Sequence, residues 1–213
     1  MQKYSHIIWD WNGTLLDDVA LSIASVNVML KKRNMPTLDS IDAYHNVFCF
    51  PVIDYYRRMG FNFDIEPFDK IAVEYIDLYY NDMGGAELFP EAIQILADCH
   101  RIGIRQIILS ASESSRLLSQ IEPFDIFHFF DDILGIDNIY ATSKTELGRD
   151  YINRIKPEDA LMIGDTIHDK QVADALGIDC VIVACGHQSK RTLLSCGATV
   201  LDSLPDVRTI IGI

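Results

Sequence analysis

Three short apolar runs, each ending at a polar side chain, limit the fold of this 213-residue chain more than any other feature. They are Ile7-Ile8-Trp9 before Asp10, Ile107-Ile108-Leu109 before Ser110, and Leu161-Met162-Ile163-Gly164 before Asp165. Runs this short and this apolar are typical of strands buried on both faces, as in a parallel sheet covered by helices. Ligands of such sheets bind outside the carboxyl ends of the strands. We therefore expect the three polar residues to meet at one edge.

Composition narrows the possible partners. A net charge of -13 argues against a nucleic-acid binder, which needs a basic face. No apolar stretch approaches the ~20 residues that span a bilayer, so no membrane partner is expected. Five cysteines, an odd number without C-x-x-C spacing, indicate reduced thiols in a cytoplasmic protein. The first strand reaches Asp10 too early for a signal peptide.

The pattern along the chain predicts a doubly wound α/β fold with a helical insert. Residues 15–88 show helical patterns near 17–33, 38–46, 51–59 and 68–82, with no convincing strand, and hold 11 of the 21 Phe, Tyr and Trp residues. Helices and strands alternate afterwards. Helices are expected at 91–101, 114–121, 144–155, 170–176 and 189–196, and strands at 105–110, 129–134, 160–164, 180–184 and 199–201. We expect a catalytic core of 1–14 and 89–213, with 15–88 as a cap.

The first motif, Asp10-Trp11-Asn12-Gly13-Thr14, follows the first strand. A carboxylate at a strand end, followed by glycine and a hydroxyl, suits nucleophilic attack on phosphorus. Glycine also lets backbone N–H groups approach an anion. The ordinary alternative is a plain turn, since Asn-Gly is a common turn dipeptide.

The segment from Gly164 to Asp169 carries two carboxylates, Asp165 and Asp169, near another strand end. That spacing suits a hard, oxygen-ligated cation such as Mg²⁺. Alternatively, Asp169 only caps a helix that begins at Lys170.

Ser110, Ala111 and Lys144 are candidates for binding phosphate oxygens. The Ser110 hydroxyl and nearby backbone N–H groups suit this role, although a helix cap or loop serine is the commoner use. Ser143 and Glu146 have the spacing of a capping box, which places Lys144 in a first helical turn where the helix dipole disfavours a cation. Such a placement favours a functional Lys144. An exposed lysine pointing away is the alternative.

Together these four segments resemble the haloacid dehalogenase superfamily, in particular its phosphoglycolate phosphatase-like branch with a helical cap. The resemblance covers nearly the whole chain. It implies that Asp10 attacks phosphorus to form an aspartyl-phosphate. It also implies that Asp10, the carbonyl of Asn12 and Asp165 hold Mg²⁺, with Asp169 close by. Thr14, Ser110, Ala111 and Lys144 would then contact the phosphoryl group, and Lys144 would assist catalysis.

One residue departs from the family pattern. Asn12 stands where these enzymes usually carry an acid/base Asp, and an amide cannot exchange a proton near neutral pH. Acid–base help is typically worth ~10²–10⁴ in rate. Asp17 or His168 are possible substitutes. His187 could line the entrance, but a plain loop histidine is the more ordinary reading.

The sequence therefore predicts a Mg²⁺-dependent phosphatase acting on a small phosphorylated metabolite such as phosphoglycolate or a sugar phosphate, as a monomer or homodimer. Two alternatives stay open. One is a phosphotransferase or mutase of the same fold. The other is a catalytically weak protein that binds phosphoanions or a partner, which Asn12 motivates.

Overall fold

A computed structural model describes residues 3–81, 85–137 and 144–213. Within these residues six strands form one parallel sheet in the order β5-β4-β1-β6-β7-β8. The strands are β1 (His6–Trp9), β4 (Arg105–Glu113), β5 (Asp132–Ile136), β6 (Ala160–Gly164), β7 (Asp179–Val183) and β8 (Thr199–Leu201). The expected doubly wound α/β fold is confirmed.

Both faces of the sheet are buried, as the apolar runs predict. Ile7 and Trp9 pack on one face, while Ile8 and Met162 pack on the other. The first face is covered by α5 (Ala92–Arg101), α6 (Ser114–Ile121) and α10 (Val207–Ile211), and the second by α7 (Lys144–Ile155) and α8 (Ile167–Leu176). Alternate residues of a strand point to opposite faces, so every residue of β1 is buried.

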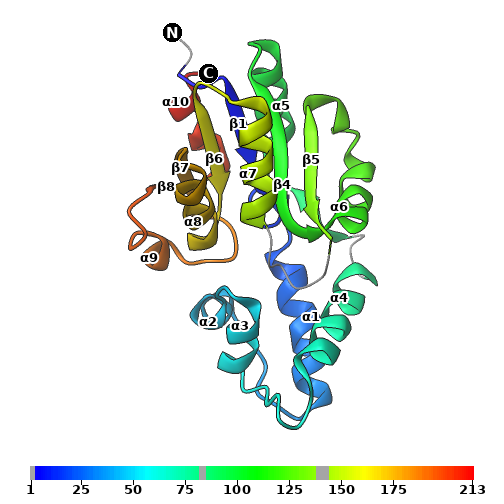
Figure 1. The fold of residues 1–213 in the computed structure, drawn as a ribbon. Coiled ribbons are helices and arrows are strands. Elements are labelled where there is room, and N and C mark those ends of the chain that lie inside the picture. Colours follow the sequence, from blue (N-terminus) through cyan, green and yellow to red (C-terminus); the bar gives the residue numbers. More distant parts are fainter. Residues whose placement is uncertain (1–2, 82–84, 138–143) are drawn as a thin grey trace.

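Four helices form a cap beyond the edge of the sheet, as Figure 1 shows. They are α1 (Val19–Lys32), α2 (Ile41–Val47), α3 (Val52–Arg58) and α4 (Phe68–Asn81). The cap has its own apolar core, in which Met29 and Leu30 of α1 pack with Tyr44, Tyr56 and other rings. The high aromatic content of this segment therefore has a structural role.

The chain enters and leaves the cap through a small antiparallel sheet that the sequence pattern missed. Strands β2 (Leu16–Asp17) and β3 (Glu87–Leu88) pair with each other and not with the central sheet. The expectation of no strand between 15 and 88 was therefore wrong. Two-residue strands are too short for a period-two pattern. The expected boundaries, 15 and 88, remain a prediction, although both fall at this sheet.

Several boundaries also differ from expectation. The residues from Phe127 to Phe129 form a 3₁₀ turn before β5, so the strand expected at 129–134 begins later. Helix α9 (Lys190–Leu193) is shorter than the expected 189–196, and α10 had no expected counterpart. Among the described residues, no helix has the length and apolar character needed to cross a membrane.

Candidate active site

Three buried carboxylates and one lysine meet at the carboxyl edge of the sheet. One oxygen each of Asp10, Asp165 and Asp169 lies within 4.8 Å of the others. Lys144 Nζ lies 2.6 Å from Oδ1 of both Asp10 and Asp169, and only 3% of Lys144 is exposed. The alternative of an exposed Lys144 pointing away from the helix was therefore wrong. Ser143, its expected N-cap, lies outside the described residues.

Backbone geometry brings Asp10 and Asp165 together. β1 lies between β4 and β6, and the Asp10 N–H donates to the Ile163 carbonyl at 2.8 Å. Gly13, with φ of 72°, lies so close to Asp165 that any Cβ would collide with that carboxylate. The Asp165 carboxylate accepts from the His187 N–H at 2.6 Å and from Thr14 Oγ1 at 3.3 Å. Thr14 thus supports Asp165, and its expected contact with substrate remains a prediction.

Charge and burial oppose each other in this cluster. Burial raises the pKa of Asp10 to about 6 and raises that of Asp165 well above its usual range. Burial also disfavours the charged Lys144, but the carboxylates of Asp10 and Asp169 outweigh this and raise its pKa. One ammonium cannot balance three carboxylates. The surplus negative charge and the all-oxygen donor set fit a hard divalent cation.

Asp169 takes part in capping, but not as expected. Helix α8 begins at Ile167, and Thr166 is its N-cap. Asp169 lies in the first turn, where its Oδ2 accepts from the Thr166 N–H at 3.0 Å and from the Thr166 hydroxyl at 2.7 Å. A helix starting at Lys170 was therefore wrong. Asp169 completes a capping box with one oxygen and contacts Lys144 with the other.

Ser110 lies inside a strand, since β4 continues to Glu113 with an irregular register after Leu109. The strand expected to end at Ser110 was too short. Ser110 is 1% exposed, and its hydroxyl accepts from the Ser112 N–H at 3.0 Å. Ser110 and Ala111 line the same cavity as Asp10, which is a suitable position for binding phosphate. Their role in binding phosphate stays a prediction.

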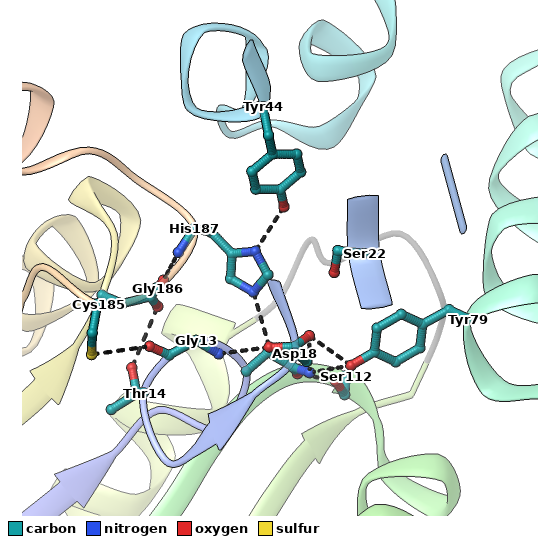
Figure 2. A network of polar contacts seen from close by, with 12 residues as sticks. Gly13, Thr14, Asp18, Ser22, Tyr44, Tyr79, Ser112, Cys185, Gly186 and His187 are labelled. Carbon is teal, nitrogen blue, oxygen red and sulfur yellow. Dashed lines mark hydrogen bonds and ion pairs between the residues drawn. The ribbon is translucent and has the colours of Figure 1, made fainter. Parts of the chain in front are cut away.

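The Asn12 side chain is fully engaged in a polar network with three partners, Asp18, Tyr79 and Ser112. Figure 2 labels these partners. Its Nδ2 donates to Asp18 Oδ2 at 3.0 Å and to the Tyr79 hydroxyl at 2.8 Å. Its Oδ1 accepts from Ser112 Oγ at 2.9 Å. Tyr79 in turn donates to Asp18 at 2.6 Å. The amide at position 12 therefore joins core to cap.

His187 is a buried part of the same network. Its Nε2 lies 3.2 Å from Asp18 Oδ1 and its Nδ1 lies 2.7 Å from the Tyr44 hydroxyl of the cap, as Figure 2 shows. Burial disfavours the charged imidazole, yet the Asp18 carboxylate raises the pKa of His187 to about 9. The interpretation as a plain loop histidine was wrong, because His187 is 6% exposed and lines the cavity.

Of the two expected substitutes for an acid/base Asp at position 12, His168 lines the cavity and Asp17 does not. Asp17 is an exposed residue of β2 and is not part of the cavity wall, whereas its neighbour Asp18 is. His168 does line the cavity, where its ring stacks on Phe50 with centroids 4.7 Å apart, and burial lowers its pKa.

The site opens into a cavity of about 170 Å³ between core and cap. Its core side carries Asp10, Asn12, Ser110, Lys144 and Asp165, and its cap side carries aromatic and aliphatic residues of α3 and α4. Arg57 and Arg58 are exposed and are not part of its wall, which is typical of a solvated helix face.

Comparison with known proteins agrees with this geometry. The haloacid dehalogenase-like hydrolase family matches residues 7–183. The phosphoglycolate phosphatase of Caulobacter vibrioides is 21% identical over 214 residues, which cover 94% of this chain and 88% of that protein. A haloacid dehalogenase-like hydrolase of Streptococcus pneumoniae shares the fold with a TM-score of 0.83, at 20% identity over 99% of both chains. Protein tyrosine kinase A of Mycobacterium tuberculosis shares it with a TM-score of 0.84, at 23% identity over 100% of both. The resemblance predicted from the motifs is confirmed, and this chain belongs to the haloacid dehalogenase-like hydrolase family.

Proposed function

We propose that this enzyme is a phosphatase that hydrolyses a small phosphate monoester through a phosphoryl group on Asp10. The observation that carries the proposal is the Asp10–Lys144–Asp169 contact, with both distances 2.6 Å, next to Asp165. The Lys144 ammonium beside Asp10 favours the ionised carboxylate, which is the form able to attack phosphorus. Lys144 then faces the negative charge of the transferring group.

Asp10, the backbone carbonyl of Asn12 and Asp165 would hold Mg²⁺, with Asp169 close by. The ion would offset the repulsion between carboxylate and phosphate and stabilise oxygens in the transition state. Ser110 and the N–H of Ala111 would orient the phosphoryl oxygens from β4. The cap would open to admit substrate and close to exclude bulk water.

Protonation of the leaving oxygen is the step for which Asn12 is poorly suited. An amide whose hydrogens are held by Asp18 and Tyr79 does not release a proton. The residues near Asn12 that exchange protons are Asp18 and His187, which are paired with each other. We therefore expect phosphoryl transfer to Asp10 to be faster for substrates whose leaving group needs no proton.

Phosphate release from a panel of monoesters, with Mg²⁺ and with excess chelator, tests the proposal. We expect Mg²⁺-dependent release that Asp10→Asn abolishes without changing the circular dichroism spectrum. Retention of most activity in Asp10→Asn would contradict the mechanism. Absence of release from every monoester would instead favour a protein that binds phosphoanions without turnover.

A second candidate is transfer of the phosphoryl group to an acceptor other than water. The engaged amide of Asn12 bears on it, because slow activation of the attacking water would leave the phosphoryl group on Asp10 long enough to meet another acceptor. One relative of similar fold is named as a tyrosine kinase. Product analysis in the presence of an alcohol or a sugar phosphate separates the two: a phosphorylated acceptor indicates transfer, and inorganic phosphate alone indicates hydrolysis.

A further inference from the structure

The cap side of the cavity is built from apolar and aromatic side chains. Phe48 stacks on His187 with ring centroids 4.9 Å apart, which holds this wall against the core. The wall includes Phe48, Phe50, Val52, Tyr55, Tyr56 and Ile76. Aromatic rings bind other rings through stacked or edge-to-face contacts, in addition to the gain from apolar burial. The wall therefore favours a flat, apolar leaving group.

The size of the cavity favours a leaving group of about one ring. An apolar protein cavity of ~150 Å³ holds one benzene molecule. The cavity here is about 170 Å³, and a phosphoryl group at Asp10 occupies part of it. The space that remains suits a single ring better than a nucleoside or a disaccharide.

The charges in the wall disfavour a second anionic group on the substrate. Apart from histidines, the cations lining the described cavity are Lys144 and Arg116. Lys144 is held by two carboxylates, and Arg116 lies 4.7 Å over the Tyr80 ring beside Glu113, which shares the same wall. The Asp18 carboxylate also faces the cavity. A carboxylate tail would meet the like charges of Asp18 and Glu113, while Arg116, which has no carboxylate partner among the described residues, lies over the Tyr80 ring.

From these three observations, and resting on the proposed function, we propose that the substrate is an aryl phosphate whose leaving group is one small, uncharged aromatic ring. An Asp10 oxygen forms a bond to phosphorus, and the bond from phosphorus to the aryl oxygen breaks. The phenolate leaves with the electron pair and takes a proton from water. A second water hydrolyses the aspartyl-phosphate, releasing inorganic phosphate and restoring Asp10.

The amide of Asn12 is consistent with this substrate class. A phenol has a pKa of about 10, whereas an alkyl alcohol resembles water, at about 15.7. A phenolate therefore departs without a protein acid, while an alkoxide does not. The hydrogens of the Asn12 amide are engaged by Asp18 and Tyr79. The lack of a protein acid at this position therefore slows phosphoryl transfer from an aryl phosphate to Asp10 only slightly.

Calorimetric binding of two stable phosphonates to the wild-type protein with Mg²⁺ tests the proposal without requiring turnover. Phenylphosphonate presents a ring, and phosphonoacetate presents the carboxylate of a phosphoglycolate-like substrate. We expect phenylphosphonate to bind with a Kd at least tenfold lower. Equal or tighter binding of phosphonoacetate, or no binding of phenylphosphonate, would overturn the proposal. Preferential binding of phenylphosphonate without hydrolysis of phenyl phosphate would support the ring site and refute the phosphatase.

A matched pair of variants on α4 tests whether this wall of the cavity selects the ring. Ile76 lines the cavity, whereas Val73 on the same helix is 45% exposed and lies outside this wall. Ile76→Arg should lower the preference for phenylphosphonate at least tenfold by placing a cation beside the ring site. Val73→Arg should leave the preference within twofold of wild type. The same change in both variants would contradict the assignment of this wall.

Discussion

Replacing Asn12 by Asp should destabilise the protein, even though it restores the residue common in the family. The Asn12 Nδ2 lies 3.0 Å from Asp18 Oδ2, so Asn12→Asp brings two carboxylates into contact. At that distance and an effective dielectric constant of about 20, their repulsion is about 5.5 kcal/mol. Protonating one carboxyl at pH 7 relieves it, at a cost of about 4 kcal/mol from a usual pKa of about 3.9. Because protonation is the less costly of the two, we expect Asn12→Asp to lose about 4 kcal/mol of unfolding free energy.

A loss of about 4 kcal/mol corresponds to a fall in Tm of roughly 8–16 °C for a chain of this size. Differential scanning calorimetry of wild type and Asn12→Asp at pH 7 measures it. We expect no gain in kcat on an alkyl phosphate from this single change. The ~10²–10⁴ that acid–base help is typically worth would be gained only if the loop had not adapted to the amide. The contacts of Asn12 with Asp18 and Tyr79 show that adaptation.

The double variant Asn12→Asp with Asp18→Asn is the matched control. It keeps one carboxylate and one amide in the pair, so it should have a higher Tm than Asn12→Asp alone, while remaining below wild type because the Asp18–His187 ion pair is lost. It should also raise kcat on the alkyl phosphate above wild type, towards the ~10²–10⁴ that acid–base catalysis supplies. If Asn12→Asp alone were as stable as wild type and faster, the reasoning from the network would be refuted.

Two further predictions concern the metal and pH. Asp165→Ala should sharply weaken the dependence of phosphate release on Mg²⁺, measured by metal titration, and full wild-type activity in excess chelator would contradict a metal requirement. His187 should stabilise the fold fully below its unfolded pKa of about 6.5 and progressively less as the pH rises through its folded pKa of about 9. The wild-type Tm should therefore fall more between pH 6.5 and 9 than that of His187→Gln, and parallel curves would count against the Asp18–His187 ion pair.

The strand ends made the buried cluster at the edge of the sheet predictable. Asp10 and Asp165 each follow a short apolar run, and parallel strands bring such residues to one edge whatever their distance in sequence. Lys144 was found through a conflict between its charge and the helix dipole. These are local signals, and each can be read without knowing which helices pack together.

The network around Asn12 could not be predicted in the same way. Asp18 and His187 lie 169 positions apart and meet only once the cap is folded onto the core. Tyr44 and Tyr79 come from separate cap helices, and their hydroxyls carry no sequence signal that distinguishes them from other core tyrosines. His187 follows the end of β7, so the strand-end rule that identified Asp10 could also have identified it.

Trapping the phosphoryl group tests most directly whether Asp10 is the nucleophile. The protein is mixed briefly with Mg²⁺ and an aryl phosphate, quenched, and treated with borohydride, which reduces an acyl phosphate but not a free carboxylate. Mass spectrometry of the peptides should find the reduced residue at Asp10, and no reduction without substrate. Phosphate release with no modification at Asp10, or with modification at another carboxylate, would contradict Asp10 as the nucleophile.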